Sequence, residues 1–574
     1  MLTYHDYMLN FPLPKLKHYL GEQMIETLIE WSPGNESLLT KKRLATMIDC
    51  IYGSNIFKSR EFRKDLLLSM KKEEIFDIRD KCLSRPEKAI NDPYQLVDII
   101  ARKTWGNNRI SRFLLSKWGV DENSLNKETC SVEIAEKVSS SSSRFYELLD
   151  YQYCIKQRAL FNLNSGHLQE RLFIHMPTGT GKTKTSMHTI VNYMTLPERK
   201  KGLVIWVAHT TELLLQAYDT FVNVWSHIGD GECTIYKIWG SNTIQSINEQ
   251  LNGIAFCGLA KLMSIYDNDP QLFERLQKNC RLLVFDEAHK ASAQKTKTVI
   301  EKLMRMPAGF ENRALVGLSA TPGRTTDASY NNSELSNMFG NKLIYIDSDI
   351  INQMNMGRQE ALNAITDNNV IRYFQERRIL SKITPKRLVY QTDFSEKELQ
   401  LLSKELENIG AEDDYSDKQL RVFAENKDRN RVIMQELREL YNKKVPTIVF
   451  ACSVPHAKML SAMLTLEGID NSLVVGDMNP IDRKYAIDEF KNKRKSVIIN
   501  YEVLTTGFDS KNIKCVFITR PTKSVVLYSQ MLGRGLRGPM MGGNEECLLI
   551  DIDDNLNAFN NESAFSHFND YWRV

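Results

Sequence analysis

The sequence predicts an α/β protein in which two domains, each built on a parallel sheet, follow a mostly helical N-terminal region. Apolar runs of strand length alternate with helix-compatible segments in two separate series along the chain. Such alternation is typical of parallel strands joined by crossover helices. The length agrees, since 574 residues are too many for one hydrophobic core.

The region 1–138 is expected to form a helical accessory domain. Its apolar residues recur every three to four positions, for example over 66–70 and 94–100, and prolines and asparagines separate these segments. Charged positions such as Glu61 and Asp65 are typical of solvated helix faces and do not favour a nuclease site.

Consecutive serines at 139–143 mark the expected domain boundary. A serine run has no core-forming side chains, so we expect a flexible linker over 139–147. The other boundaries follow the composition of the chain. We expect a first α/β domain over 148–359, a charged helical connector over 360–443, a second α/β domain over 444–557 and a tail over 558–574.

Strand-length apolar runs define the two α/β domains. In the first domain the expected strands cover 172–175, 203–207, 254–257, 282–285 and 314–319. In the second they cover 447–451, 472–475, 497–500, 515–519 and 547–551. Only the first series contains a glycine-rich loop between a strand and a helix, so we expect the two domains to have different roles.

Composition limits the classes of protein that this chain can be. Apolar residues make up 42% and charged residues 25%, which is ordinary for a soluble globular protein. The formal net charge of +4 is too small to indicate nucleic-acid binding by itself. Ten cysteines are scattered without a CxxC pair, which indicates reduced thiols and no zinc site. With no signal peptide and no apolar run near ~18 residues, we expect a cytoplasmic protein that does not contact membranes.

The glycine-rich segment 176–183, Met-Pro-Thr-Gly-Thr-Gly-Lys-Thr, follows an expected strand and opens an expected helix. This is the setting of a phosphate-binding loop, in which glycines let backbone N–H groups converge on one anion. Lys182, a predicted catalytic residue, would reach the β- and γ-phosphates of ATP, and the Thr183 hydroxyl would ligate Mg²⁺. The predicted nucleotide-binding residues of the loop are Thr178, Gly179, Thr180, Gly181, Lys182 and Thr183.

The segment 286–289, Asp-Glu-Ala-His, ends another expected strand. Asp286 would share the Mg²⁺ with Thr183, and Glu287 would polarise the attacking water. Met176 stands where the general loop pattern has a glycine, which disfavours a kinase or a small GTPase. The two segments together predict hydrolysis of a nucleoside triphosphate.

Further short motifs lie near the ends of expected strands and helices. They are Leu-Asp-Tyr-Gln at 149–152, Ala-His-Thr-Thr-Glu-Leu at 208–213, Ser-Ala-Thr-Pro at 319–322, Phe-Ala-Cys-Ser at 450–453, Thr-Thr-Gly-Phe-Asp at 505–509 and Gln-Met-Leu-Gly-Arg-Gly-Leu-Arg-Gly at 530–538. In this order the chain from 148 to 555 resembles the core of the superfamily 2 helicases. More narrowly, it is similar to the motor of the R subunits of type I and type III restriction enzymes and to related stand-alone bacterial helicases. The resemblance implies two RecA-like domains and does not extend to 1–138.

The resemblance implies a nucleotide site that the second domain completes. Gln152 would read the edge of adenine, although a surface glutamine is the alternative. Gln530 and Asp509 would face the nucleotide from the second domain. Arg534 and Arg537, three positions apart on one expected helix face, would reach across the cleft as arginine fingers.

The resemblance also implies contacts with the backbone of a nucleic acid, made by Thr210, Ser453 and Thr505. Thr210 is equally suited to cap the N-terminus of a helix. A coupling group would link the nucleotide site to movement along the strand, with hydroxyls bonded to the carboxylates of the 286–289 motif. Its members are His289, Ser319 and Thr321. A plain turn is the alternative for Ser319 and Thr321.

The function that these motifs imply is an ATP-dependent translocase or helicase, and we expect DNA as its substrate. An RNA helicase stays open, because the sequence does not reveal a preference for the 2′-OH. A nucleic-acid-sensing ATPase switch in a multiprotein defence complex, without unwinding, stays open as well. The segment 256–261 lacks the threonine expected of the family there, and no nuclease motif is visible. The N-terminal region 1–138 is a candidate surface for binding a protein partner.

Overall fold

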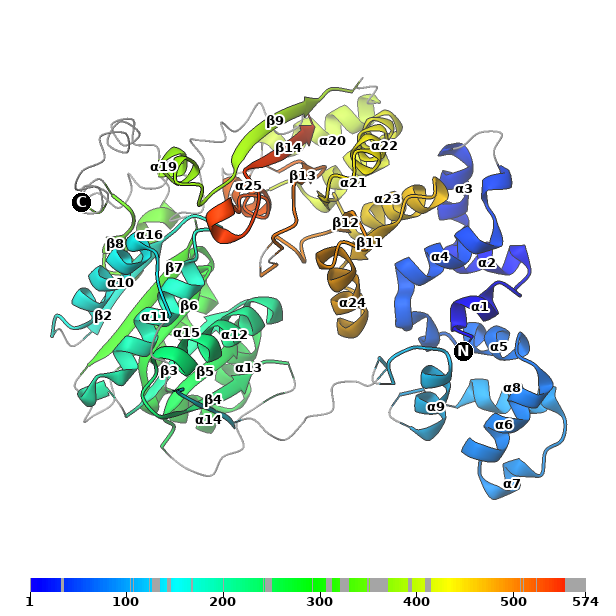
Figure 1. Ribbon diagram of the computed structural model, residues 1–574, viewed down its shortest axis with the longest axis horizontal. Helices are drawn as coiled ribbons and strands as arrows, with labels where there is room; N and C mark the ends of the chain where they lie inside the picture. The colour runs from blue at the N-terminus through cyan, green and yellow to red at the C-terminus, as the bar shows by residue number, and fades with distance from the viewer. Residues whose placement is uncertain are drawn as a thin grey trace.

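The protein is described here from a computed structural model of the chain (Figure 1). The structure describes residues 2–552 except for the segments 32–35, 126–134, 142–145, 167–168, 243–249, 306–311, 321–329, 348–349, 351–369, 391–394 and 408–413 and the single residues 104, 107, 123, 200, 241, 292, 506, 509 and 523. Among the described helices, none combines the length and the hydropathy that a membrane span needs.

The first sheet has the strand order β1-β4-β5-β3-β6-β7-β2-β8. Its strands are β1 (Ala135–Ser139), β2 (Gln169–His175), β3 (Leu203–Ala208), β4 (Glu232–Ile238), β5 (Gly253–Gly258), β6 (Cys280–Asp286), β7 (Arg313–Ser319) and β8 (Leu343–Ile344). Neighbouring strands pair in parallel, except that β1 runs antiparallel to β4. We call the part of the chain from β1 to β8 domain 1.

Helices cover both faces of this sheet. They are α10 (Asp150–Leu163), α11 (Lys182–Thr195), α12 (Thr211–Ile228), α13 (Leu259–Asn268), α14 (Pro270–Asn279), α15 (Gln294–Met304) and α16 (Tyr330–Met338). Along β3, Val204 and Trp206 belong to the core under α10–α12, whereas Leu203 and Ile205 belong to the core under α13–α15. A strand buried on both faces needs an uninterrupted apolar run, and this requirement made β3 easy to predict.

The strands predicted for domain 1 are present, but its sheet is wider than predicted, because β1, β4 and β8 were missed. The position of β1 corrects the expected boundary at 138–139. Residues 135–139, which were assigned to the helical domain and the linker, pair with β4 at the edge of the first sheet. None of them is buried, so the strand has no apolar run that a search for strands could detect.

The second sheet has the order β11-β12-β10-β13-β14-β9, with every pair parallel. Its strands are β9 (Lys382–Leu388), β10 (Thr447–Phe450), β11 (Asn471–Val474), β12 (Val497–Asn500), β13 (Cys515–Ile518) and β14 (Glu546–Ile552). Its helices are α20 (Glu396–Glu407), α21 (Asp417–Glu425), α22 (Lys427–Asn442), α23 (Val454–Leu466), α24 (Pro480–Lys491) and α25 (Val525–Leu532). We call the part from β9 to β14 domain 2; a short helix, α19 (Val370–Glu376), precedes it.

The separate helical connector predicted over 360–443 is wrong in one respect. Its α20, α21 and α22 are helical as expected, but β9 is the edge strand of the second sheet, beside β14. Lysine and proline at the exposed positions of β9 protect an open sheet edge and remove the apolar signal of a strand. The connector is therefore part of domain 2. Residues 360–369 and the tail 558–574 lie outside the described residues.

The N-terminal region is helical, as predicted. Its helices are α1 (Tyr4–Met8), α2 (Leu13–Leu20), α3 (Glu22–Trp31), α4 (Lys41–Tyr52), α5 (Arg60–Leu68), α6 (Lys72–Cys82), α7 (Arg85–Lys88), α8 (Pro93–Arg102) and α9 (Arg109–Lys117), with a 3₁₀ segment η2 (Gly53–Lys58) after α4. We call the described part of 2–125 the N-terminal domain.

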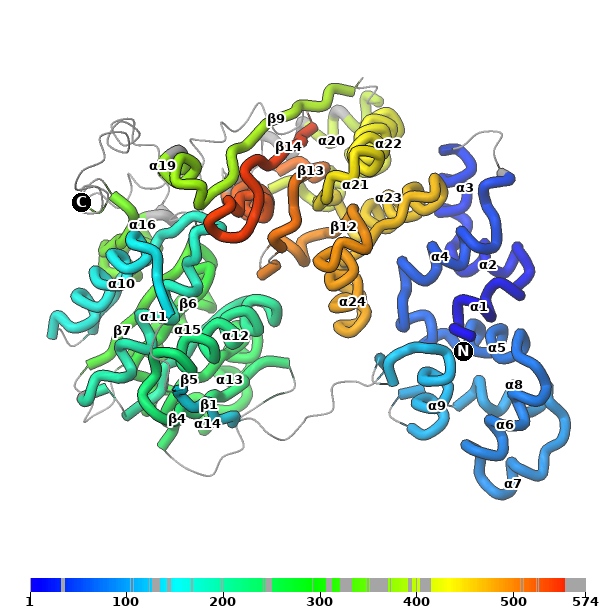
Figure 2. Tube along the Cα trace, viewed as in Figure 1, coloured from blue at the N-terminus to red at the C-terminus, as the bar shows by residue number. Residues whose placement is uncertain are grey.

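Among the described residues, the N-terminal domain packs on domain 2 and not on the domain that follows it in sequence. One continuous hydrophobic core joins α4 of the N-terminal domain to α23 and β11 of domain 2. Leu44 and Ile48 on α4 and Leu460 and Leu464 on α23 are completely or almost completely buried there. Figure 2 shows the N-terminal helices beside α23 and α24, with domain 1 on the other side of α24.

Candidate nucleotide site and its surroundings

The predicted phosphate loop connects β2 to α11. Gly179 and Gly181 have φ angles of 87° and 85°, which only glycine adopts without strain. The Thr180 hydroxyl donates to the Pro177 carbonyl oxygen at 2.8 Å and closes the turn. Lys182 is the first residue of α11, so the loop directs backbone N–H groups and the positive end of the helix dipole to one point. This local geometry is that of an anion site.

Tyr151 and Gln152, at the start of α10, hold this loop from behind. The Tyr151 hydroxyl and the Gln152 Nε2 donate to the Thr180 carbonyl oxygen at 2.7 and 2.9 Å. The Gln152 Oε1 accepts from the backbone N–H of Leu149 at 3.0 Å. Gln152 is buried, so it is not the surface glutamine of the alternative reading. Its amide holds the phosphate loop, and the predicted contact with an adenine edge stays a prediction; the part of Tyr151 was missed.

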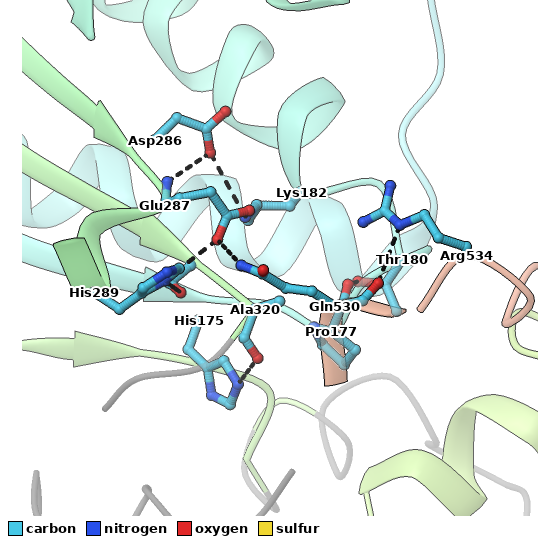
Figure 3. A network of polar contacts seen from close by, with 11 residues as sticks. His175, Pro177, Thr180, Lys182, Asp286, Glu287, His289, Ala320, Gln530 and Arg534 are labelled. Atoms are coloured by element: carbon cyan, nitrogen blue, oxygen red, sulfur yellow. Dashed lines mark hydrogen bonds and ion pairs between the residues drawn. The ribbon is translucent and has the colours of Figure 1, made fainter. Parts of the chain in front are cut away.

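Lys182 lies between the two acidic residues that end β6. Its Nζ is 3.1 Å from Glu287 Oε1 and 3.6 Å from Asp286 Oδ1 (Figure 3). Glu287 adopts a φ of 54°, unusual for a residue with a side chain, and its N–H donates to Asp286 Oδ1 at 3.0 Å. The structure therefore brings the three predicted catalytic residues of domain 1 together.

The charges of this cluster are strongly coupled, because both carboxylates are buried and the Lys182 side chain is largely shielded from solvent. Burial raises the pKa of the Asp286 carboxyl. Burial also acts to raise the pKa of Glu287, but the nearer ammonium of Lys182 outweighs it and holds that pKa below its usual range. Lys182 in turn has a raised pKa, since the two carboxylates outweigh its own burial. One ammonium thus balances two carboxylates, and the site still favours a further cation.

His289 and Ser319 link β6 to β7 beside the carboxylates. The His289 Nδ1 lies 3.0 Å from the Ser319 hydroxyl and 3.4 Å from Glu287 Oε2. Burial lowers the pKa of His289 to about 3, so the imidazole is neutral near pH 7. The Ser319 hydroxyl, predicted to bond a carboxylate of this motif, lies at hydrogen-bond distance from the imidazole. Thr321 lies outside the described residues.

Domain 2 reaches the same cluster through α25 and the turn after it. The Gln530 Nε2 donates to Glu287 Oε2 at 3.5 Å (Figure 3). The Arg534 guanidinium donates to the carbonyl oxygens of Gln530 and Phe508 at 3.1 and 2.7 Å. Its charge acts to lower the pKa of Lys182, and both side chains belong to the group of residues shown in Figure 3. Asp509 lies outside the described residues.

Arg534 and Arg537 do not share a helix face, which corrects the prediction. The helix α25 ends at Leu532, and the glycine-rich turn carries both arginines beyond it. Arg537 pairs with Leu380 in an isolated β-bridge. The glycines instead allow close contact between the two domains. A Cβ on Gly533 would lie only 2.5 Å from the Cβ of Thr178 in the phosphate loop. The turn of domain 2 therefore lies directly on the phosphate loop.

The predicted contacts with nucleic acid lie at the carboxyl ends of strands. Thr210 follows β3 and caps α12, where its Oγ1 accepts from the Leu213 N–H at 3.3 Å. Ser453 follows β10 and caps α23, where its Oγ accepts from the His456 N–H at 3.2 Å. The N-cap alternative for Thr210 is therefore confirmed. Both hydroxyls keep an O–H that can donate to a phosphate.

Thr505, the third predicted contact, uses its hydroxyl within its own turn. Its Oγ1 donates to the Glu502 carbonyl oxygen, and its N–H bonds the same oxygen at 3.1 Å. The Glu502 carboxylate accepts from Arg520 at 2.7 Å. This turn follows β12, so the three predicted contacts lie at the same edge of the two parallel sheets.

A buried network holds the loop that carries Ser453. The His456 Nδ1 accepts from the Cys452 N–H at 3.1 Å, and its Nε2 donates to the Asn430 side-chain oxygen at 3.1 Å. The neighbouring Arg429 donates to the Thr519 carbonyl oxygen at 2.7 Å. Sequence reasoning missed this role of Arg429 and Asn430, because the partners lie far apart in the chain.

Family models match both halves of this arrangement. Residues 145–324 match the model of the res subunit of type III restriction enzymes, and residues 428–538 match the model of the helicase conserved C-terminal domain. A putative mitochondrial ATP-dependent helicase of Schizosaccharomyces pombe is 26% identical over 392 residues, which are 68% of this chain and 54% of that protein.

Two other relatives show shorter matches. A putative ATP-dependent helicase of Saccharomyces cerevisiae is 33% identical over 142 residues, which are 24% of this chain and 20% of that protein. An ATP-dependent DNA helicase of Schizosaccharomyces pombe is 25% identical over 245 residues, 41% of this chain and 27% of that protein. The chain thus spans about half or less of the length of these curated relatives.

Proposed function

Because this chain belongs to the superfamily 2 helicases, we propose that it translocates along nucleic acid and hydrolyses ATP between its two α/β domains. The observation that carries the proposal is the contact of Glu287 with both domains. Lys182 of domain 1 lies at one oxygen of this carboxylate, and Gln530 of domain 2 donates to the other. A site that needs both domains can convert the state of the nucleotide into relative movement of the domains.

The residues of the phosphate loop would bind ATP through the N–H groups around Gly179 and Gly181, with Lys182 on the terminal phosphates. Lys182 would exchange its carboxylate partners for phosphate oxygens, which frees Glu287 to orient and polarise the attacking water. Thr183 and the buried Asp286 would hold Mg²⁺, which neutralises phosphate charge when it is bound.

The turn after α25 would supply the positive charge that the transferred phosphoryl group requires. The charge of Arg534 acts to lower the pKa of Lys182, and Arg537 follows three positions later in the same turn. A guanidinium suits this role because its fork engages two phosphate oxygens at once. Without domain 2 the site lacks these charges, so we expect turnover only in the closed arrangement.

Movement along a strand would come from contacts at the edge of the two sheets. Thr210 belongs to domain 1, and Ser453 and Thr505 belong to domain 2, so closure changes the spacing between their contacts. Contacts to phosphates make such movement independent of base sequence and sensitive to salt. We propose DNA as the strand; the relatives include a DNA helicase and also RNA helicases, and the experiment below distinguishes the two substrates.

The first experiment is ATP hydrolysis by the purified protein and by Lys182→Ala, with single-stranded DNA, double-stranded DNA and RNA added separately. We expect DNA to stimulate ATP hydrolysis by the parent protein, and we expect none of the three nucleic acids to stimulate hydrolysis by the variant. If RNA alone stimulated hydrolysis, RNA would replace DNA as the proposed substrate. No hydrolysis under any of these conditions would refute the proposal. If nucleic acid does stimulate hydrolysis, a strand-displacement assay distinguishes an unwinding enzyme from a translocase.

A further inference from the structure

The first turn of α24 in domain 2 contacts both of the other domains through neighbouring residues. Asp482 binds the N-terminal domain, and Arg483 binds domain 1. The two side chains leave the same helical turn, so a displacement of either one moves the backbone of the other. No motif of the sequence pointed to this junction.

On the side of the N-terminal domain, Asp482 accepts two hydrogen bonds from one residue. The Ser54 N–H and the Ser54 hydroxyl both lie 2.7 Å from Asp482 Oδ2. The approach is close, because a Cβ on Gly53 would lie 2.5 Å from the same oxygen. One residue before α24, the Asn479 side chain donates to the Ser124 carbonyl oxygen. Three residues of the N-terminal domain thus surround the start of this helix.

On the side of domain 1, the Arg483 Nη1 lies 2.6 Å from Glu212 Oε1. Both side chains are largely buried, with 19% and 27% exposed. Glu212 is the second residue of α12, two positions after the predicted contact Thr210. The Gly507 turn of domain 2 approaches the same helix start, since a Cβ there would lie 3.0 Å from the Leu213 nitrogen. Domain 2 therefore holds the N-terminus of α12 at two points.

The N-terminal domain and domain 2 share a packed interface, so we expect them to move as one body. Their shared core runs from α4 to α23 and β11, and separate polar contacts join them away from α24. Trp31 donates to Glu467 at 3.2 Å, and Cys50 lies 3.3 Å from the Ser461 hydroxyl. The described helices α3 and α4 pack on α23, whereas no described helix or strand of domain 1 packs as closely on one of domain 2, although a hydrophobic core and the contacts of Gln530, Gly533 and Gly507 also join those two domains. We therefore expect opening on the side of domain 1, with the ion pair of Arg483 and Glu212 among the contacts that break.

We propose that Arg483 is a positioning residue for ATP hydrolysis. The N-terminal domain holds Arg483 in place through its contact with the neighbouring residue Asp482. In this arrangement Arg483 binds Glu212 and fixes the closed approach of domain 2 to domain 1, which brings Arg534 to the phosphate loop. The inference rests on the proposed function, because it assigns a role in turnover. The N-terminal domain would then influence ATP hydrolysis without contacting the ATP site. A change that disturbs the contact of Ser54 with Asp482 would reduce turnover, although neither residue belongs to that site.

The test compares three single substitutions in steady-state ATP hydrolysis with nucleic acid at saturation. Arg483→Met removes the contact with domain 1, Asp482→Asn weakens the contact with the N-terminal domain, and Arg494→Met is the control. Arg494 lies just after α24 and makes an equally short ion pair, 2.6 Å, but with Glu489 of its own domain. We expect the first two to lower kcat by roughly fivefold each, the effect of about 1 kcal/mol on closure, with KM for ATP unchanged.

The KM stays near the parental value because the ATP-binding loop belongs to domain 1 alone, whereas kcat depends on closure. The control should keep the parental kcat. The charge swap Arg483→Glu with Glu212→Arg should restore most of kcat, which a folding defect would not do. A parental kcat for Asp482→Asn together with a reduced kcat for Arg483→Met would overturn the part assigned to the N-terminal domain. Parental values for both would overturn the whole inference.

A second readout does not depend on catalysis. Energy transfer between dyes on Asn268 of domain 1 and Tyr94 of the N-terminal domain, both exposed, reports the distance between these domains. We expect Arg483→Met and Asp482→Asn to shift the transfer efficiency in the same direction, and Arg494→Met to leave it unchanged. An unchanged efficiency in all three would refute the inference even if the protein proved not to hydrolyse ATP, so the two proposals can fail separately.

Discussion

Gln530 of domain 2 donates a hydrogen bond to Glu287 of domain 1, across the interface between the two sheets, at 3.5 Å. The other oxygen of the same carboxylate lies 3.1 Å from the Lys182 ammonium. The carboxylate that would orient the water is thus held by one group from each domain. Its position is set by the closure of the domains as much as by its own strand.

Gln530→Ala should lower kcat for ATP hydrolysis by roughly tenfold and leave KM for ATP within about twofold of the parent. The reason is that a hydrogen bond to a charged, buried group is worth about 1.5–3 kcal/mol, and this one forms only when the domains are closed. Steady-state kinetics at saturating nucleic acid measures both constants.

Gln530→Glu provides the stricter version of this test. It places a second carboxylate against Glu287 in a buried position, so kcat should fall further than in the alanine variant. If the alanine variant raised KM and kept kcat, Gln530 would bind ATP in the ground state, and the coupling described above would be wrong.

Lys182→Met should destabilise domain 1 by about 3–5 kcal/mol near pH 7.5, in addition to abolishing hydrolysis, because it leaves two buried carboxylates without their cation. The loss should shrink toward pH 5. In the parent the pKa of Glu287 is lowered, so its stabilising contribution is present above the unfolded pKa and is lost only as pH falls below that value. In the variant the ammonium no longer offsets the burial of the two carboxyls, and protonation at lower pH relieves the repulsion between them.

Hydrogen exchange of the β6 amides at pH 5.0 and 7.5 measures this difference. Lys184→Met is the matched control, because Lys184 lies on the same helix and donates to the backbone carbonyl of Glu147. A loss of stability that was equal at the two pH values would show that Lys182 contributes packing and not charge compensation.

The central strands and the catalytic cluster of domain 1 could be predicted from the sequence, because local rules govern both. A strand such as β3, buried on both faces, needs an apolar run, and a phosphate loop needs glycines beside a lysine. The side chains at the ends of β2 and β6 then meet because parallel strands place their carboxyl ends at one edge.

What the sequence did not reveal depends on contacts between distant segments. The edge strands β1 and β9 are mostly exposed and polar, so they carry no apolar run. The hydrogen bond of the Gln152 amide to the Thr180 carbonyl oxygen was not predicted either, because the two residues lie 28 positions apart in the chain. No sequence motif marks Arg483, because its proposed role depends on contacts of α24 with two other domains that form only in the tertiary structure.

His456 should make the stability of domain 2 depend on pH. Its two hydrogen bonds require the neutral ring with the proton on Nε2, and burial lowers its pKa to about 3. A group whose pKa is lowered by folding destabilises the fold as pH falls below its unfolded value of about 6.5, because only the unfolded chain takes up the proton.

We expect the free energy of opening at β10 to fall by about 1.4 kcal/mol between pH 7.5 and pH 5.5 in the parent through this residue. His456→Asn should remove that part of the slope, at a cost in stability at high pH. Hydrogen exchange of the β10 amides measures both, and the exposed His18→Asn serves as the control. An identical slope in His456→Asn and in the parent would mean that folding does not shift the pKa of this ring.

Gly533→Ala should uncouple the two domains without affecting the binding of ATP to domain 1. The added Cβ would lie 2.5 Å from the Thr178 Cβ, where both partners belong to backbone-constrained turns, so the turn of domain 2 has to withdraw from the phosphate loop. Gly476→Ala is the matched control in the same domain, because a Cβ there meets nothing within 4 Å. We expect Gly533→Ala to lower kcat by roughly tenfold or more while the affinity for a fluorescent ATP analogue stays parental, and Gly476→Ala to change neither. Equal kcat in the two variants would mean that the contact of Gly533 with the phosphate loop is not part of the state in which ATP is hydrolysed, and the arginines of this turn would then have to act from a more distant position.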